Sequence, residues 1–442
     1  MSAKTRIPRC LAMQERARRA IPGMCQLLSK RPDMYSLGVW PGYFERAAGS
    51  RVWDLDGNEY VDMSIGGIGA NVLGYADPDV DAAVLEAVRK GASTSLNCPE
   101  EVLLAERLIA LHPWAEMARF TRSGGEAMAV AVRIARAATG RSTLAFCGYH
   151  GWHDWYLSAN LGRDGLDGHL LAGLEPAGVP RGLAGTARPF RFNRLDELQA
   201  IADDVPEGLA AIVLEPIRNF RPDPAFVRGV RALADRTGAA LIFDEISAGF
   251  RFACGGSHLA LFPERPDICV LSKALGNGYA ISAVLGARAT MQAAQKTFIS
   301  STAWTERVGF AAALACVDKH ARLDVPALLD AAGRQVMAGW AAAAKRNGLE
   351  ITVGGMPPIA HFEFDDPRHD ELKAYFIQLM LERGFLASTL YYAMTTHSAA
   401  ELDGYLAATD ECFGLLARAL AAGDLAARLE GRPAAHGFTR LN

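Results

Sequence analysis

The chain lacks the long apolar runs and the basic stripes that mark several large classes of protein. No apolar run reaches membrane-spanning length, and none near the N-terminus has the form of a secretory signal. The formal net charge is −3, and no lysine-rich tail or RNA-binding motif is present. We therefore expect a soluble, cytoplasmic protein that binds neither membranes nor nucleic acids.

Paired cysteines are also missing. The eight cysteines are scattered and form no C-x-x-C pair, which predicts buried thiols in a reducing compartment rather than disulfides or a zinc site. His150, His153 and Asp154 lie close together in the sequence, but their spacing is too generic to indicate a metal site. We expect no metal.

What the chain does have is enough apolar sequence for a large core. Of its 442 residues, 50% are hydrophobic. From about residue 97 to 313, apolar strands alternate with helical patterns, which is typical of an α/β domain with a mostly parallel sheet. We predict a large domain at 71–320 and a smaller α/β domain formed by residues 1–70 and 321–442.

Two apolar runs end in side chains that are costly to bury. Residues 241–243 lead into Asp244, and residues 269–271 are followed after one serine by Lys273. As neighbouring parallel strands, they would carry the carboxylate and the amine to one edge of the sheet. Two such groups together indicate a ligand that needs both. Pyridoxal phosphate (PLP) is such a ligand, because its protonated ring nitrogen pairs with an anion and its aldehyde forms a Schiff base with a lysine.

A phosphate cradle is predicted at Ser123, Gly124 and Gly125. These residues precede an alanine-rich helical pattern at 127–136, which Gly140 can end. Free N–H groups and the helix dipole favour an anion at a helix start, and Ser123 adds a hydroxyl.

Three further residues are expected beside the cofactor ring. Ile246 lies two positions beyond Asp244, so on a continuing strand it would share a face with Asp244 and press on one side of the ring. Tyr149 follows the preceding apolar strand and is the candidate for stacking on the other side. His150 is expected to form a hydrogen bond nearby.

Taken together, these motifs resemble the class III aminotransferases, which are fold type I PLP enzymes, and most of all glutamate-1-semialdehyde 2,1-aminomutase. The resemblance covers nearly the whole chain, and the order and spacing of its motifs are more specific than any single one. The motifs are Glu45–Asp62, Leu73–Pro78, Ser123–Ala127, Leu214–Pro216, Asp244–Arg251, Ser272–Gly278 and Ser301–Thr302.

The resemblance implies a role for each matching residue. Lys273 would hold the cofactor and then move the proton as general base and acid, while Asp244 would pair with the ring nitrogen. The Ser123–Gly125 cradle would bind the phosphate. Thr302 would reach the phosphate of a neighbouring subunit, which implies a homodimer with its active site at the interface. Glu215 would order the site.

The chain also departs from the family pattern. Gly125 stands where the family usually has threonine, and residues 303–307 replace the usual Gly-Gly-Asn-Pro turn after Thr302. The segment 384–398 lacks the acid that the aminomutase carries there. An aminotransferase is therefore the first prediction, and an aminomutase of the glutamate-1-semialdehyde type, or a racemase or epimerase, is the alternative.

Substrate recognition is predicted from guanidinium groups, which bind carboxylates in a bidentate manner. Arg31 and Arg218 are the candidates. The segment 154–185 has little periodicity and is long enough for a lid over the site.

The predicted reaction moves an amino group from a small amino acid or amine to a keto or aldehyde acceptor. From a different class, Gly66-Gly67-Ile68-Gly69 suggests a nicotinamide-dependent dehydrogenase, but Val72 breaks the Gly-x-Gly-x-x-Gly pattern. A catalytically silent cofactor-binding protein is the other alternative. An absorbance band that borohydride traps on Lys273 excludes the dehydrogenase, and conversion by amines excludes the silent protein.

Overall fold

The structure is a computed structural model that describes residues 6–161, 176–217 and 219–434. The chain divides into two compact units. Unit 1 comprises Met1–Asp77 and Ala327–Asn442, and unit 2 comprises Pro78–Pro326. Among the described helices, none has both the length and the apolar character needed to cross a membrane.

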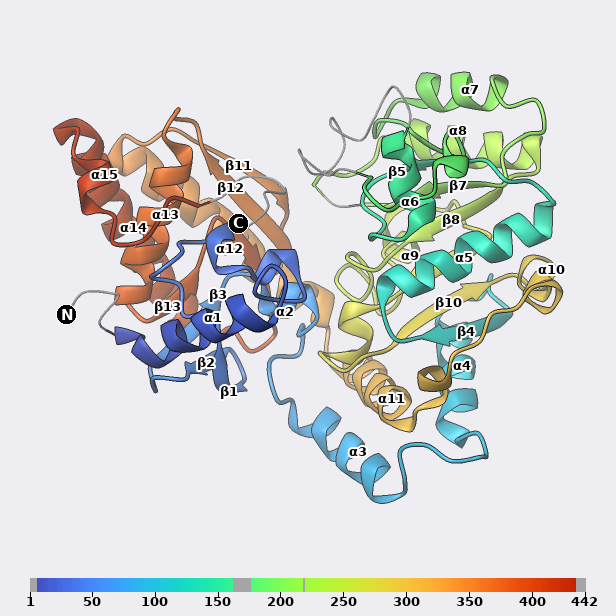
Figure 1. Ribbon diagram of the computed structural model, residues 1–442, viewed down its shortest axis with the longest axis horizontal. Helices are drawn as coiled ribbons and strands as arrows, with labels where there is room; N and C mark the ends of the chain where they lie inside the picture. The colour runs from blue at the N-terminus through green and yellow to red at the C-terminus, as the bar shows by residue number, and fades with distance from the viewer. Residues whose placement is uncertain (1–5, 162–175, 218, 435–442) are drawn as a thin grey trace. The chain divides into compact units, whose positions relative to one another are not determined.

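Unit 2 is built on a seven-stranded sheet with the order β4-β10-β9-β8-β7-β5-β6 (Figure 1). Strand β10 is antiparallel to both of its neighbours, and the other pairs are parallel. The predicted, mostly parallel α/β sheet is confirmed. The strands are β4 (Met117–Thr121), β5 (Leu144–Cys147), β6 (Ala187–Pro189), β7 (Ala211–Leu214), β8 (Ala240–Asp244), β9 (Ile268–Leu271) and β10 (Ser282–Gly286).

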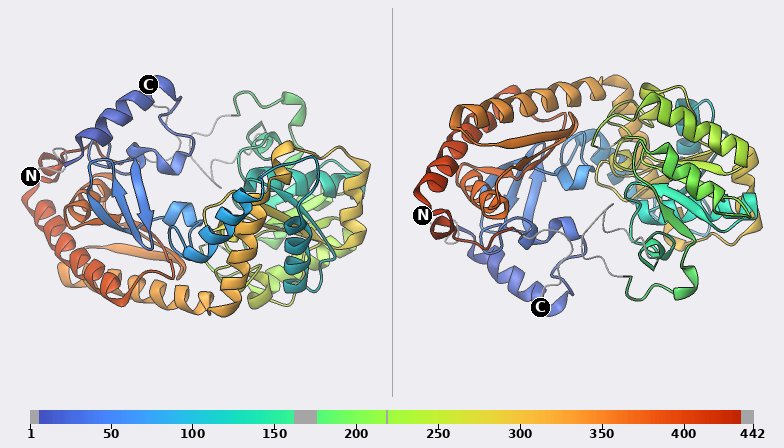
Figure 2. Two further views of the ribbon diagram at one scale, coloured as in Figure 1. Left: turned by 90° about the horizontal axis from the view of Figure 1, so that it is seen from below. Right: turned by 90° about the horizontal axis from the view of Figure 1, so that it is seen from above.

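The strands of unit 2 are continuous apolar runs because helices cover both faces of the sheet (Figures 1 and 2). Every residue of β5, β7, β8, β9 and β10 is buried. Alternate residues such as Val213 and Ile242 pack with α5 on one face, whereas Ile212 and Phe243 pack with α7 and α8 on the other. The sheet is therefore packed on both faces, and the loops lie at its edges.

Helix α5 (Gly124–Thr139) contains the predicted 127–136 pattern and begins three residues earlier. Ser123 caps it, and Gly140 ends it in the left-handed conformation with φ of 70°. The other helices of unit 2 are α3 (Pro78–Arg89), α4 (Pro99–Leu111), α6 (Asp154–Leu157), α7 (Leu195–Asp203), α8 (Pro224–Thr237), α9 (His258–Leu261), α10 (Arg288–Met291) and α11 (Arg307–Arg322). Short 3₁₀ turns include η4 (Ser158–Leu161), η6 (Arg181–Leu183), η7 (Lys273–Gly276), η8 (Gln292–Lys296) and η9 (Thr302–Thr305).

Unit 1 holds two small sheets, β1-β2-β3-β13 and β11-β12-β14. Strands β2 and β3 form an antiparallel pair near the N-terminus. Strand β13 pairs in parallel with β3, so the two ends of the chain share one sheet. The strands are β1 (Phe44–Ala48), β2 (Arg51–Asp54), β3 (Glu59–Met63), β11 (Ile351–Met356), β12 (Ile359–Phe364), β13 (Phe385–Ala387) and β14 (Leu390–Tyr392).

The helices of unit 1 pack against these sheets and against each other, as α13 does with both α14 and β13. The long helix α12 begins two residues before the unit boundary. The helices are α1 (Pro8–Ala20), η2 (Leu28–Lys30), η3 (Pro32–Met34), α2 (Gly66–Gly69), α12 (Val325–Asn347), α13 (His369–Glu382), α14 (Ala399–Ala422) and α15 (Leu425–Arg428).

Candidate active site

Asp244 and Lys273 lie at the same edge of the unit 2 sheet. Strand β8 ends at Asp244, which pairs in parallel with Val270 of β9. Lys273 begins η7 two residues after β9 ends. Because parallel strands bring their carboxyl ends to one edge, where ligands of open α/β sheets bind, this edge is the candidate site.

The Lys273 amine contacts a hydroxyl that the sequence reasoning missed. Its Nζ donates to Ser247 Oγ at 2.8 Å, and Lys273 itself is half-buried. Its φ of 45° lies in the left-handed region, which is uncommon for a residue with a side chain. The signal for Ser247 was its place three residues beyond Asp244, in the loop that leaves the same edge.

The Asp244 carboxylate is buried and held from two sides. Oδ2 lies 2.7 Å from His150 Nδ1, and Oδ1 accepts the N–H of Ile246 at 3.1 Å. His150 Nε2 in turn lies 3.2 Å from the carbonyl oxygen of Cys147. Burial raises the pKa of Asp244, while the hydrogen bond and charge of His150 act in the opposite direction. His150 therefore orients Asp244 and favours its anionic form.

The sequence predicted that the strand continues to Ile246, but β8 ends at Asp244. Because the Asp244 side chain accepts the N–H of Ile246, the backbone turns immediately after β8. Ile246 nevertheless reaches the predicted cradle, since a Cβ placed on Gly124 would lie 2.8 Å from Ile246 Cδ1.

The Ser123–Gly125 cradle has the geometry of an anion site. Ser123 is the N-cap of α5 in a capping box, in which Glu126 Oε2 accepts the N–H of Ser123 at 3.0 Å. Gly124 and Gly125 are the first two helical residues, so their N–H groups have no acceptor within the helix. A Cβ on Gly125 would lie 2.9 Å from the His153 ring, so this position requires glycine or a shift of His153.

These groups fit PLP. The cradle offers main-chain donors for a phosphate, Asp244 offers a buried carboxylate for a protonated ring nitrogen, and Lys273 offers an amine for an aldehyde. All three lie in unit 2. The residues present would therefore hold the cofactor without rearrangement of the sheet.

Tyr149 and Glu215 are joined by a hydrogen bond. Glu215 is buried, and its Oε2 accepts the N–H of Tyr149 at 2.9 Å. Gly148 approaches the same carboxylate so closely that a Cβ there would lie 2.6 Å from Oε2, and its φ is 116°. Tyr149 is 40% exposed, and its ring packs edge-on against Tyr156 at 6.1 Å. Glu215 thus holds the backbone that presents Tyr149.

Thr302 is exposed at the start of η9, and Arg122 holds the turn behind it. Arg122 Nε donates to the carbonyl oxygen of Ala303 at 2.7 Å, and Nη2 donates to those of Trp304 at 3.3 Å and Glu306. Arg122, which sequence reasoning did not select, directly precedes the cradle and so ties it to the Thr302 turn.

Of the two predicted substrate arginines, Arg31 lies among the described residues. Arg31 lies in unit 1 and is buried, with Nε 3.0 Å from Asp33 Oδ1 and Nη2 2.5 Å from Asp33 Oδ2. One edge of its guanidinium group is therefore already paired with a carboxylate. Arg218 lies outside the described residues. The predicted lid is described only at its two ends, 154–161 and 176–185.

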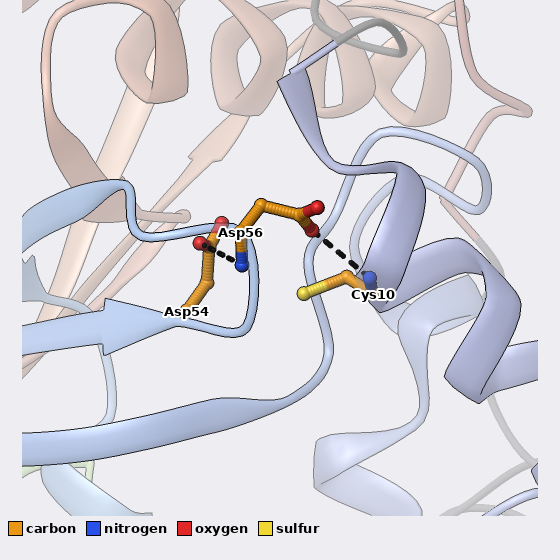
Figure 3. Close-up of side chains that lie close together, drawn as sticks. All are labelled: Cys10, Asp54 and Asp56. Atoms are coloured by element: carbon orange, nitrogen blue, oxygen red, sulfur yellow. Dashed lines mark hydrogen bonds between the residues drawn. The ribbon is translucent and has the colours of Figure 1, made fainter.

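A second cluster, Cys10, Asp54 and Asp56 in unit 1, brings its ligand atoms within 4.8 Å of one another (Figure 3). Asp56 accepts the N–H groups of Arg9 at 2.8 Å and Cys10 at 2.9 Å, in the first turn of α1. Asp54 accepts the N–H of Asp56 at 2.9 Å. Burial raises the pKa of the Cys10 thiol to about 12. The cluster is thus explained as a helix cap.

The Gly66–Gly69 segment does not form a dinucleotide loop. All four of its residues have positive φ, between 46° and 73°, and they make a single left-handed turn. A nucleotide loop instead requires a regular helix start that presents its N–H groups. The feature that suggested a dehydrogenase is therefore a structural turn.

Comparison with known proteins gave consistent matches. The profile described as "Aminotransferase class-III" matches residues 38–395. The 3-aminobutyryl-CoA aminotransferase of Cloacimonas acidaminovorans (strain Evry) is 32% identical over 398 residues, which cover 87% of this chain and 92% of the relative. The 2'-deamino-2'-hydroxyneamine transaminase of Streptomyces kanamyceticus is 36% identical over 336 residues, which cover 76% and 80%.

Solved structures agree with these matches. The FumI protein of Sphingopyxis sp. MTA144, in its PLP internal aldimine form, superposes with a TM-score of 0.85 at 27% identity, covering 97% of this chain and 99% of FumI. A glutamate-1-semialdehyde-aminomutase from Pseudomonas aeruginosa PAO1 superposes with a TM-score of 0.79 at 22% identity, covering 94% and 96%. This second likeness shows the same fold.

Proposed function

The chain belongs to the class III aminotransferases, which are PLP-dependent enzymes, and we propose that Lys273 and Asp244 are the residues that carry its amino-group transfer. The observation that carries the assignment is their placement at one edge of the unit 2 sheet, with the Ser123–Gly125 cradle in the same unit. The enzyme transfers an amino group from an amino acid or amine to a keto or aldehyde acceptor.

PLP, when bound, supplies an electrophilic carbonyl and an electron sink. Asp244 keeps the proton on the ring nitrogen, and His150 supports its anionic form. Lys273 would anchor the cofactor through its amine, and the same amine would accept the proton of the substrate carbon and return it. The cradle N–H groups and the Ser123 hydroxyl bind the phosphate. Ile246 and Tyr149 would contact the two faces of the ring.

We propose a homodimer as the working form. Thr302 is exposed and would contact the phosphate held by a second copy of the chain. Large apolar side chains near Thr302 in the sequence and in the loop between α3 and α4 are exposed, with Phe298 at 85% and Leu96 at 82%. Exposed apolar side chains of this size favour burial in an interface between protein chains.

We propose that unit 2 is the large cofactor-binding domain that the sequence predicts at 71–320, and that unit 1 is the small domain predicted at 1–70 and 321–442. The limits between the two units lie after Asp77 and after Pro326. A cytoplasmic location is also proposed. All eight cysteines are free thiols, which supports a reducing compartment.

The substrate class is proposed from two observations. Arg31 already pairs with Asp33, which argues against a free guanidinium at that position for an α-carboxylate. The similar 3-aminobutyryl-CoA aminotransferase acts, by its name, on a substrate with the amino group on carbon 3. We therefore propose an amine donor whose amino group is not next to a free carboxylate. To test this, the enzyme is mixed with each member of a panel of such amines and of α-amino acids. Loss of the cofactor's visible absorbance measures the reaction of each donor.

Lys273→Ala is the decisive test of the site. The variant is expected to purify with weakly held, non-covalent cofactor and to lose turnover, because the anchoring amine and the proton carrier are both removed. Borohydride treatment and peptide mass spectrometry of the wild type should find the cofactor on Lys273. Lys296→Ala, at an exposed position in η8, is the control and should behave as wild type. Full activity in Lys273→Ala would end the assignment.

A further inference from the structure

Ser247 lies in a turn whose position is fixed from two sides. The N–H of Gly249 donates to the carbonyl oxygen of Glu245 at 2.7 Å, and Nε of the fully buried Arg251 donates to the carbonyl oxygen of Ser247 at 2.9 Å. The backbone of Ser247 is therefore held in place, so its hydroxyl is presented to Lys273 by the fold.

The end of the same loop is anchored by a carboxylate. Glu245 is completely buried. Its carboxylate accepts hydrogen bonds from the Ser257 hydroxyl at 2.6 Å, the N–H of Ser257 at 2.9 Å and the N–H of His258 at 3.0 Å. His258 Nδ1 lies 2.8 Å from the same carboxylate. The loop that carries Ser247 is thus pinned at both ends, next to Asp244.

A hydroxyl suits a lysine that changes its protonation state. An ammonium only donates hydrogen bonds, whereas a neutral amine also accepts one. A serine hydroxyl accepts from the first and donates to the second, so it keeps contact with Nζ in both forms. The lysine stem has four carbons joined by rotatable bonds, so a hydrogen bond to Nζ narrows the range of positions that the amine samples.

We propose that Ser247 is a positioning residue for Lys273, holding Nζ at the sheet edge whenever the amine is not bonded to the cofactor. The inference rests on the proposed function and extends it to a residue that the cofactor assignment does not use. It predicts that Ser247 affects the formation of the covalent bond to Lys273 but not the binding of the cofactor's ring and phosphate. In that step the Lys273 nitrogen bonds to the aldehyde carbon, and the aldehyde oxygen leaves as water.

Ser247→Val and Ser247→Thr form a matched pair, because valine and threonine have the same shape and only threonine keeps a hydroxyl. The cofactor is removed from each protein, and PLP or pyridoxamine 5'-phosphate is added back. Pyridoxamine 5'-phosphate occupies the same ring and phosphate contacts but cannot bond to a lysine. Growth of the visible band measures bond formation with PLP, and fluorescence quenching measures the affinity for pyridoxamine 5'-phosphate.

We expect Ser247→Val to slow bond formation about fivefold, the size of one lost hydrogen bond, with an unchanged affinity for pyridoxamine 5'-phosphate. Ser247→Thr should match the wild type. An equal loss with both compounds in the valine variant would show a general effect on the pocket and overturn the proposal. An unchanged or faster rate would overturn it as well. If the wild type formed no band at all, the proposed function itself would fail instead.

Discussion

At the scale of single residues, the balance of charge around Asp244 decides how the site works. A buried carboxylate tends to take up a proton, and burial does raise its pKa here. His150 counters this by a hydrogen bond at 2.7 Å, and the N–H of Ile246 adds a second. The carboxylate can thus stay anionic inside the protein, which its proposed role toward a protonated ring nitrogen requires.

Replacing His150 with phenylalanine should therefore move the acid limb of the activity profile. Because His150 lowers the pKa of Asp244, its removal raises that pKa, and Asp244 becomes protonated at a higher pH. On acidification, kcat of the variant should begin to fall at a higher pH than kcat of the wild type. In the alkaline range the two values should be closer. Measurement of kcat against pH checks this.

Asp244→Asn is the matching control for the His150 variant. It keeps the shape of the side chain but not its charge, so the protein should fold and lose about a hundredfold or more in kcat at every pH. Unchanged kinetics in Asp244→Asn, or an acid limb that does not move in His150→Phe, would contradict this account of the pair.

Much of this site follows from the sequence, because acids and lysines at the ends of apolar runs are local signals. Asp244 and Lys273 were found in that way, and the cap at Ser123 follows from its helix. Ser247 and Arg122 were not. Ser247 contacts an amine 26 residues away, and Arg122 contacts carbonyl groups 181 to 184 residues further along the chain. Such contacts depend on how the loops pack, and no local sequence pattern encodes that packing.

At the scale of elements, α3 and α4 expose large apolar side chains on the face that does not pack against α11. Both helices pack against α11, and their inward residues, such as Val84 and Leu104, are buried. A surface helix usually turns polar residues outward. Here the outward positions hold large apolar side chains that are more than half exposed, namely Leu85, Val88, Val102 and Leu103.

A charge placed on this face should separate the proposed dimer. Leu96, in the loop between α3 and α4, is 82% exposed, so Leu96→Glu should not disturb the fold of an isolated chain. In an interface, however, it would bury an unpaired carboxylate. We expect a shift from dimer to monomer in sedimentation equilibrium and a parallel loss of activity, since Thr302 would no longer reach a second site.

Phe44→Glu provides the control, because Phe44 is 62% exposed but lies in unit 1. This variant should sediment with the same mass as the wild-type dimer. A wild type that sediments as a monomer while fully active would refute the dimer proposal, and so would a Leu96→Glu variant that stays dimeric.

The elements also show where sequence patterns stop being informative. Continuous apolar runs predicted the buried strands, since only a sheet covered on both faces needs them. The reversed direction of β10 and the left-handed turn at Gly66–Gly69 were not predicted. Strand direction depends on the path of the connections, and a run of glycines is compatible with either hand.

At the scale of the whole molecule, buried histidines link stability to pH in both units. Burial lowers the pKa of His112 and His320 in unit 2, and of His397 in unit 1, each to about 4. In the unfolded chain a histidine titrates near 6.5. Between these values the unfolded chain binds more protons than the folded one. The stabilisation is therefore complete above about pH 6.5 and is lost as the pH falls toward 4.

His320 gives the cleanest test of this linkage. Both of its ring nitrogens are buried and have no hydrogen-bond partner among the described residues, and its ring packs edge-on against Phe250 at 5.2 Å. His320→Phe should keep the packing and remove the titration. Near pH 7.5 its urea midpoint should equal or exceed that of the wild type, because two unpaired polar atoms are gone. Toward pH 4 its advantage should grow by up to about 3 kcal/mol.

His369→Phe is the control for this comparison, because it makes the same substitution at a histidine whose side chain is 42% exposed. The direction in which the stability difference between His320→Phe and the wild type changes with pH also distinguishes the effect of the buried histidine from that of other titrating groups. Asp62 and Asp244 are buried carboxylates with raised pKa, so they bind protons more tightly when folded and oppose the histidines as the pH falls. A His320→Phe advantage that shrinks on acidification would therefore mean that the ring is already charged in the folded protein.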